Sequence, residues 1–329
     1  MNIRFRSKSI HIKGLVQGVG FRPFIYRLAL AHELLGWVEN RNDGVLIHVE
    51  GPADAISKFI DEIPVHAPEA ANIFSLETTG IPLKYYKEFS IRKSENTSEE
   101  ITEISPDIAV CDACLADLKS QKHRLNYPFI NCTNCGPRFT IIKDLPYDRG
   151  ETSMAPFPMC EICNAEYKDI LDRRFHAQPV ACNHCGPIYQ LHHNGITSTD
   201  LNNILELSKE LLETGAIIAI KGLGGYHLAC DAQNQDAVQR LRTGKNRDGK
   251  PFAVMFSEIE TLKEFLTIDD IEKKELLSWQ RPIMILQNKP DGKKLAPDVS
   301  VGFNTTGAML PYMPFHHLLF EHLKIPVIV

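Results

Sequence analysis

Eight of the nine cysteines in this 329-residue chain form four C-x-x-C pairs. The first two pairs are separated by 17 residues and the last two by 18, and Gly-Pro follows each second pair. The thiolates of one pair can bind a single metal ion, and two pairs complete a tetrahedral four-cysteine zinc site. We therefore predict two structural zinc ions, one for each module, with the ligands Cys111, Cys114, Cys132 and Cys135 in the first and Cys160, Cys163, Cys182 and Cys185 in the second.

Two alternatives to this assignment stay open in the sequence. A crossed arrangement would join the first pair to the last, and redox-active dithiols would use the cysteines without a metal. His184 lies inside the last pair and is expected beside the ion or at the surface, because four cysteines already fill each site. A filled site has no open position for a substrate, so the modules are expected to act as a scaffold.

The charge of the cysteine-rich region bears on whether it binds nucleic acid. Between Cys111 and Pro187, nine lysines and arginines are balanced by nine acidic residues. Phosphate contacts dominate nucleic-acid affinity and need an excess of positive charge. The whole chain carries a net charge of −5 at pH 7. We therefore do not expect a nucleic acid as a partner.

A second group of residues, near the start of the chain, could bind an anion. The segment from Gly14 to Arg22 contains three glycines and ends in an arginine. Glycines let backbone N–H groups turn inward, and the start of a helix adds a partial positive charge. The planar guanidinium matches two phosphoryl oxygens. The alternative is a glycine-rich turn beside a solvated arginine.

A third group is a basic run that holds five positive charges in the eleven residues 240–250. It leads through Lys250-Pro251 into an apolar strand predicted at 252–256, which places its charges near the rim of a sheet. Ligands of α/β proteins commonly bind at such a rim. Lys221 follows another predicted strand, at 216–220, and begins a glycine-rich loop. A solvated helix face is the alternative for the run.

The elements that must position these groups divide the chain into three parts. Residues 1–92 show the order β-α-β-β-α-β, which is typical of a ferredoxin-like domain. Residues 93–105 form a polar linker, 106–190 the cysteine-rich domain and 200–329 an α/β domain. The predicted fold is therefore α+β and multidomain.

Local signals within these parts predict individual elements. Alternating apolar residues predict a strand from Ile3 to Ile12, and helical spacing joins Phe24, Leu28 and Leu35. A hairpin turn is expected at 42–44. Further expected elements are a helix at 55–63 ended by Pro64, a helix at 201–212 closed by Gly215 and a final strand at 325–329.

Composition excludes several classes of protein. Hydrophobic residues make up 43% and charged residues 23% of the chain, a globular mixture that excludes a disordered or collagen-like protein. The start of the chain lacks the apolar core of a signal peptide, and no apolar run approaches membrane-spanning length. A soluble, cytoplasmic protein without a membrane partner is expected.

The first part resembles the acylphosphatases. Their G-x-V-Q-G-V-x-F-R loop is matched at 14–22, and their G-W-V-x-N and D-G-x-V elements are matched at 36–40 and 43–46. The resemblance implies that Arg22 binds the phosphoryl group and that the Asn40 amide orients the attacking water. It also implies a phosphate-binding loop made of Gln17, Gly18, Val19, Gly20 and Phe21. A turn-capping role is the alternative for Asn40.

The third part is similar to YrdC-type domains, which bind ATP and make carbamoyl-type adenylates. A K-x-R-x-x-K-P element is matched at 245–251 and an S-x-x-R-P-I element at 278–283. The resemblance implies that triphosphate and carbonate oxygens are held by Lys221, Lys245, Arg247, Lys250 and Arg281.

These three units in this order resemble the HypF family of hydrogenase-maturation carbamoyltransferases, as do the segments 173–187, 221–232 and 307–320. The resemblance implies hydrolysis of carbamoyl phosphate, adenylation of the carbamate with ATP and Mg²⁺, and transfer to the C-terminal cysteine of HypE. Members of the family are about twice as long, and this chain lacks their Ser-x-Asn element and carbamoyl-transfer domain. We expect a fragment or a truncated product with an incomplete YrdC-like domain, which hydrolyses carbamoyl or acyl phosphates while adenylation is impaired.

Two rival functions stay open. A zinc scaffold could bind protein partners while its phosphatase loop is inactive. An adenylate synthase of tRNA modification would share the YrdC-like unit and use bicarbonate and threonine. The second rival leaves the acylphosphatase-like part unexplained.

Overall fold

The structure, a computed structural model, describes residues 5–92, 105–145 and 147–328. The chain forms two compact units. The first contains residues up to 108 together with 131–186, and the second contains 109–130 together with 187–329. Residues 93–104 of the predicted linker, together with Ile3 and Val329, lie outside the described residues.

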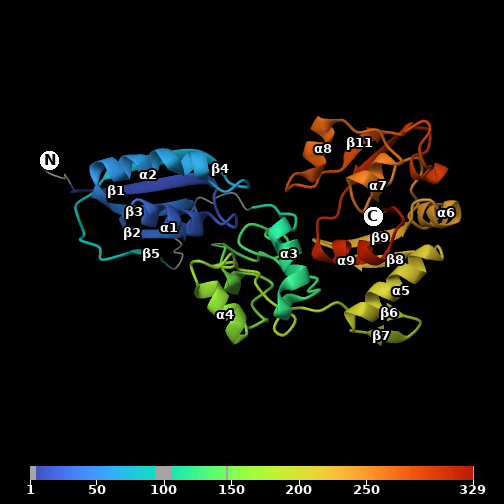
Figure 1. The fold of residues 1–329 in the computed structure, drawn as a ribbon, viewed down its shortest axis with the longest axis horizontal. Coiled ribbons are helices and arrows are strands. Elements are labelled where there is room, and N and C mark those ends of the chain that lie inside the picture. The colour runs from blue at the N-terminus through green and yellow to red at the C-terminus, as the bar shows by residue number, and fades with distance from the viewer. Residues whose placement is uncertain (1–4, 93–104, 146, 329) are drawn as a thin grey trace. The chain divides into compact units, whose positions relative to one another are not determined.

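The first unit is built on a five-stranded sheet with the strand order β4-β1-β3-β2-β5. Helix α1 packs against β2 and β5, and α2 packs against β3 and β1 (Figure 1). Ile12 of β1, Ile25 of α1 and Phe59 of α2 are fully buried in the core between them. The predicted ferredoxin-like arrangement is confirmed, with β5 added parallel to β2. The element bounds are β1 Phe5–Leu15, α1 Phe21–Ala31, β2 Leu35–Arg41, β3 Gly44–Pro52, α2 Ala53–His66, β4 Asn72–Gly80 and β5 Phe89–Ile91.

The two helices of this unit end at other residues than the sequence predicts. Helix α1 stops at Ala31 because Glu33 adopts a left-handed φ of 54°, and Leu35 begins β2 instead of ending the helix. Helix α2 continues through Pro64 to His66. A proline in the last turn removes only one helical hydrogen bond, so the helix is not broken there. The hairpin between β2 and β3 forms as predicted, with Arg41 paired to Gly44.

The cysteine-rich part of the first unit has little regular structure, namely the 3-10 turn η2 at Arg149–Glu151 and helix α4 at Glu161–Lys168. Arginines crosslink its loops by donating to backbone carbonyls. The Arg149 guanidinium donates to Gln178 O, Val180 O and Phe157 O at 2.6, 2.9 and 2.7 Å. These hydrogen bonds satisfy buried carbonyls that no helix or strand pairs, and they fix the loop that follows residue 147.

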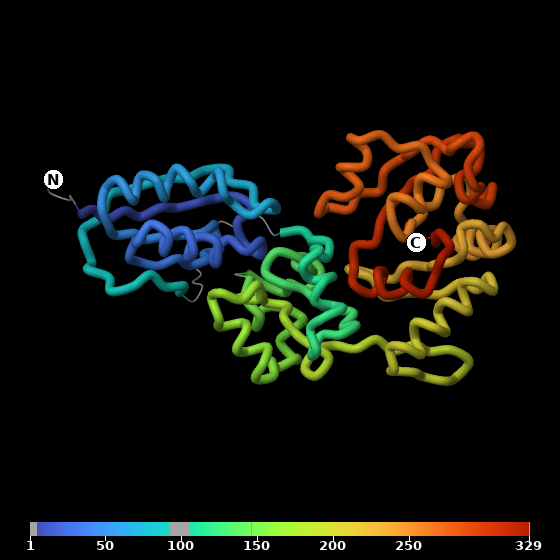
Figure 2. Tube along the Cα trace, viewed as in Figure 1, coloured from blue at the N-terminus to red at the C-terminus, as the bar shows by residue number. Residues whose placement is uncertain are grey.

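The second unit contains a six-stranded mixed sheet with the order β11-β12-β10-β13-β9-β8. Strand β13, at the red end of the tube in Figure 2, pairs with both β10 and β9, as a terminal strand at 325–329 predicts. The strands of this sheet are β8 Ile218–Lys221, β9 Tyr226–Asp231, β10 Ala253–Met255, β11 Met284–Gln287, β12 Thr305–Met309 and β13 Val327–Ile328. A separate two-stranded sheet is formed by β6 Leu191–His193 and β7 Ile196–Ser198.

Among the helices of the second unit, α5 contacts β8 and β9, and α6 contacts β9. Helix α5 ends as predicted before Gly215, which has a left-handed φ of 82°. The bounds are α3 Asp112–Ser120, η1 Lys122–Arg124, α5 Leu201–Glu213, α6 Gln235–Gly244, α7 Ile259–Lys263, α8 Asp270–Leu277, η3 Pro297–Val299 and α9 Pro314–His322. In the part of the chain that the structure describes, no helix has the length and apolar character needed to cross a bilayer.

Two histidines of α9, His316 and His317, should lower the free energy of unfolding in mild acid. Burial lowers the pKa of His316 to about 3, helped by His227, and lowers that of His317 to about 4, helped by Arg281. Unfolded, both titrate near 6.5, so the unfolded state binds more protons below that pH. Stability is therefore full above pH 6.5 and falls toward pH 4, by about 1.4 kcal/mol per pH unit for each extra proton bound.

Urea unfolding of the chain at pH 7 and pH 5 measures this effect. The His317→Gln variant should lose less stability between the two pH values than the unsubstituted chain. His192→Gln, at an exposed position on β6, is the control and should leave the difference unchanged. Equal losses in the chain and in His317→Gln would contradict the explanation.

Candidate functional site

The loop between β1 and α1 presents backbone donors at one end of the first unit. Gly18 and Gly20 have left-handed φ values of 73° and 79°, and Gly20 is the N-cap of α1. Among the residues that the structure describes, no side chain caps the first turn of this helix, so its N–H groups can bind an anion. Val19 and Phe21 are buried and anchor the loop in the core, so their contribution to a ligand is through the backbone.

Two polar side chains hold this loop in place. The Gln17 amide donates to Arg41 O at 2.5 Å and Gly44 O at 3.1 Å, which ties the loop to the β2–β3 hairpin. Arg138 donates from Nε to Gly18 O and from Nη2 to Thr133 O at 2.9 Å. With its carbonyl held by Arg138, the Gly18 peptide has a fixed orientation.

Arg22 and Asn40 line the same pocket as this loop. Arg22 is buried at the start of α1, and its Nη2 lies 3.2 Å from Asp148 Oδ1. Asn40 in β2 is 2% exposed, and within the described part of the chain its Oδ1 has no hydrogen-bond partner. A buried amide oxygen without a partner is costly unless a water or ligand satisfies it. The pocket therefore combines an anion-binding side with an acceptor that can hold a water molecule.

The opposite wall of the pocket comes from the cysteine-rich part, whose sequence does not indicate a role in this site. Its lining residues are Thr133, Arg138, Tyr147, His176, Ala177 and Gln178. Burial, and then the charge of Arg22, lowers the pKa of His176 to about 4, so its ring is neutral at pH 7. His176 also has a left-handed φ of 55°, a strained conformation for a histidine. These wall residues include His176, Ala177 and Gln178 of the segment 173–187. In the sequence this segment indicates only a family resemblance, and nothing in it predicts a contact with the glycine loop.

The eight paired cysteines form two clusters of sulfur atoms. Within each cluster the sulfurs lie within 4.8 Å of one another, and each cluster contains the four cysteines of one module. The sulfur distances are 3.7 Å for Cys132–Cys135, Cys160–Cys182 and Cys163–Cys185, and 3.8 Å for Cys182–Cys185. Four ligands at the usual Zn–S length of about 2.3 Å lie about 3.8 Å apart in a tetrahedron.

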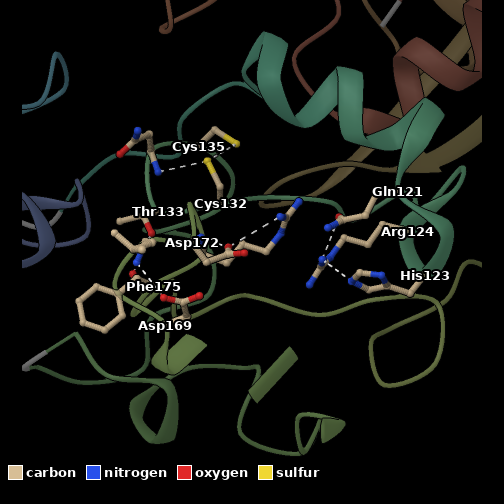
Figure 3. A network of polar contacts seen from close by, with 12 residues as sticks. Gln121, His123, Arg124, Cys132, Thr133, Cys135, Asp169, Asp172 and Phe175 are labelled. Carbon is tan, nitrogen blue, oxygen red and sulfur yellow. Dashed lines mark hydrogen bonds and ion pairs between the residues drawn. The ribbon is translucent and has the colours of Figure 1, made fainter. Parts of the chain in front are cut away.

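The environment of the sulfurs also fits zinc. The distances are far longer than a disulfide bond of about 2.05 Å. In the knuckle of the first cluster, where Figure 3 shows Cys132 beside Cys135, the Asn134 N–H points to the Cys132 sulfur at 3.4 Å. His184 is exposed and lies outside its cluster. The donor sets therefore fit two structural zinc ions, with no position left for a substrate.

The structure places the predicted nucleotide-binding residues at three locations in the second unit. Arg247 and Lys250 come together after α6, where Arg247 donates to Lys250 O at 3.2 Å and Pro251 O at 2.7 Å, and Lys245 is exposed next to them. Lys221 ends β8, with Nζ 5.1 Å from the centre of the Tyr226 ring. Arg281 follows α8 and donates to Leu276 O at 3.1 Å.

Comparisons with protein families match each part of the chain. A family model described as acylphosphatase matches residues 8–91, and one described as HypF finger matches 110–142 and 159–192. The Sua5/YciO/YrdC model, described as telomere recombination, matches 210–329. An acylphosphatase from Leuconostoc mesenteroides is 38% identical over 84 residues, which are 25% of this chain and 93% of that protein.

Comparisons with longer proteins cover almost the whole chain. The carbamoyltransferase HypF of Rhodobacter capsulatus is 43% identical over 313 residues, which are 95% of this chain but 41% of that protein. A crystal structure of full-length HypF in its phosphate- and nucleotide-bound form is 44% identical, with a TM-score of 0.92 over 99% of this chain and 42% of that one. The chain thus spans about two fifths of the length of these relatives. It belongs to the HypF carbamoyltransferase family and contains that family's acylphosphatase, zinc-finger and YrdC-like parts.

Proposed function

We propose that the first unit hydrolyses carbamoyl phosphate to carbamate and inorganic phosphate. The observation that carries this proposal is the pocket in which buried Arg22 and the unpartnered Oδ1 of Asn40 lie beside the glycine loop. Arg22 and the loop N–H groups would neutralise the charge on the phosphoryl oxygens. Such neutralisation and an in-line water contribute more to phosphoryl transfer than a strong base does.

Asn40 would accept a hydrogen bond from the attacking water and aim its lone pair at phosphorus. The P–O bond to the carbamoyl group would break as the new P–O bond forms. The carbamate would leave as an anion, and one proton of the water would pass to another oxygen of the phosphate product. Because a carboxylate-type leaving group needs no proton, the pocket requires no general acid. The neutral ring of His176 agrees with this mechanism, since an uncharged imidazole has no acidic proton to give at pH 7.

The second unit would use the carbamate in the next step of the family reaction. We propose that Lys245, Arg247 and Lys250, together with Lys221 and Arg281, hold ATP with its Mg²⁺ and the carbamoyl group while an adenylate forms. Support comes from the YrdC-like match at 210–329 and from the relative solved with phosphate and nucleotide. Transfer to the C-terminal cysteine of HypE is part of the proposal for the whole protein.

The test is a pair of assays on the same preparation. Phosphate release from carbamoyl phosphate measures the first step, and carbamoyl-phosphate-dependent exchange of pyrophosphate into ATP measures the second. The proposal expects phosphate release from this chain, and the exchange assay reports whether the second unit also forms the adenylate. A zinc-loaded, folded chain that releases no phosphate would refute the proposed function and leave the scaffold interpretation.

Asn40 offers a specific prediction for this mechanism. Asn40→Ala should lower kcat by about 100-fold, since loss of the orienting group misplaces the water in the transition state. The KM should change little, because Arg22 and the loop still bind the phosphoryl group. Steady-state phosphate release measures both constants. A raised KM with an unchanged kcat would show that Asn40 binds substrate and does not orient water.

A further inference from the structure

The pocket has a wall that an isolated acylphosphatase of the matched kind does not have. The Leuconostoc protein aligns over 93% of its length within 84 residues, whereas the wall comes from residues 133–178. Thr133 Oγ1 donates to Phe175 O at 2.9 Å, which fixes the segment that leads into His176 (Figure 3). A rigid second wall opposite a complete phosphate loop indicates recognition of the part of the substrate that is not phosphate.

Asp148 follows the pocket-lining residue Tyr147 and forms an ion pair with Arg22, which also lines the pocket. Its Oδ1 lies 3.2 Å from Arg22 Nη2, and its side chain is 33% exposed. The next residue, Arg149, fixes the position of Asp148, since its backbone N–H donates to Gln178 Oε1 at 2.9 Å and its guanidinium holds three carbonyls. The carboxylate is therefore held beside Arg22 by a fixed backbone.

A carboxylate at this place opposes the binding of the phosphoryl group, because two anions compete for one guanidinium. Its presence is explained if it binds another part of the substrate. The carbamoyl group of carbamoyl phosphate carries an NH2 with two N–H donors, and an ionised carboxylate only accepts hydrogen bonds. The methyl group of acetyl phosphate offers no donor. In carbamoyl phosphate, the P–O, O–C and C–N bonds join phosphorus to the NH2 nitrogen. A phosphoryl group bound to Arg22 therefore places the carbamoyl NH2 on the scale of the Arg22–Asp148 contact.

We propose that Asp148 is a specificity-determining residue, whose carboxylate accepts a hydrogen bond from the carbamoyl NH2 and so favours carbamoyl phosphate over acyl phosphates without N–H groups. The inference rests on the proposed hydrolytic function and adds the feature that distinguishes its substrate. His176 and Gln178 form the neighbouring surface. A charge-assisted hydrogen bond at a partly exposed site supports a preference of about 10- to 100-fold.

The experiment compares two substrates on the full, zinc-loaded chain. The kcat/KM is measured for carbamoyl phosphate and for acetyl phosphate with the unsubstituted chain, Asp148→Ala and Asp148→Asn. Asp148→Ala should lower the ratio of the two values by about 10- to 100-fold, with acetyl phosphate hydrolysis retained or improved. For Asp148→Asn, the ratio should fall between the values of the unsubstituted chain and Asp148→Ala. The asparagine amide oxygen still accepts a hydrogen bond but carries no charge.

Asp144→Asn is the matched control, since Asp144 is an exposed residue before the same turn and its carboxylate accepts from Leu145 N at 2.8 Å. It should leave the ratio unchanged. The melting temperature and zinc content of each variant show that it is folded, and the ratio is compared only among folded chains. An unchanged ratio in Asp148→Ala, including an equal loss on both substrates, overturns the inference and leaves the proposed function intact. Failure of the unsubstituted chain on both substrates overturns the proposed function as well.

Discussion

Replacement of Arg22 with alanine should slow phosphate release from carbamoyl phosphate by about 100- to 1,000-fold, the effect typical of removing one preorganised charge-stabilising group. Arg22 is buried beside the glycine loop and reaches the pocket from the first turn of α1. Lysine keeps the charge but not the planar pair of donors, so Arg22→Lys should recover only part of the rate. Steady-state release of phosphate at saturating and low substrate measures the loss.

The control for this prediction lies on the same helix. Arg27 is exposed on α1 and does not line the pocket. Arg27→Ala should therefore retain the full rate. The melting temperature of each variant reports whether α1 still packs, and phosphate release at the unsubstituted rate from a folded Arg22→Ala chain would contradict the assignment.

Loss of the second zinc cluster should lower stability and activity together. Cys163 is fully buried in α4, and its sulfur lies 3.7 Å from that of Cys185. Cys163→Ser should reduce the zinc content from two ions per chain to one. The unfolding free energy of the first unit should fall by several kcal/mol, since structural zinc contributes about 10–16 kcal/mol in zinc-finger peptides.

The same substitution should also lower the rate of phosphate release by about tenfold or more. The segment between α4 and Cys182 contributes His176, Ala177 and Gln178 to the pocket, so the cluster holds the second wall of the pocket. A small displacement of groups that position a substrate is enough for such a loss. Zinc content by metal analysis, thermal unfolding and phosphate release are measured on one preparation.

Cys230→Ala is the matched control, because Cys230 is a buried cysteine of the second unit that belongs to neither sulfur cluster. It should keep two zinc ions and the full rate of phosphate release. A Cys163→Ser chain that still binds two zinc ions would refute the ligand assignment. Normal phosphate release from a chain with one zinc ion would refute the link between cluster and pocket.

The sequence was sufficient for the fold class and for the loop, because these depend on short-range patterns. Alternation of apolar residues marks β1, and glycines mark the two left-handed positions that only a residue without a side chain adopts easily. Helix ends were predicted less well. Glu33 stops α1 in a conformation that its residue type does not favour, and Pro64 lies too near the end of α2 to break it.

The second wall of the pocket could not be predicted in the same way. Arg138 and Gly18 are 120 residues apart, and His176 is still farther from the loop, so only the folded chain brings them together. In a region with equal numbers of basic and acidic residues, an arginine is expected to be solvated, yet Arg138 is only 2% exposed. Long-range contacts of this kind depend on packing. The spacing of apolar residues along the sequence, which indicates helices and strands, does not predict them.

The central claim is that the glycine loop, Arg22 and Asn40 form one phosphoryl-binding pocket. A crystal structure of the zinc-loaded chain soaked with inorganic phosphate tests it most directly. The expected result is a phosphate ion that accepts hydrogen bonds from the Arg22 guanidinium and from backbone N–H groups of residues 18–21, with a water held by Asn40 Oδ1. A loop without phosphate at saturating concentration, with Arg22 still paired to Asp148, would contradict the claim.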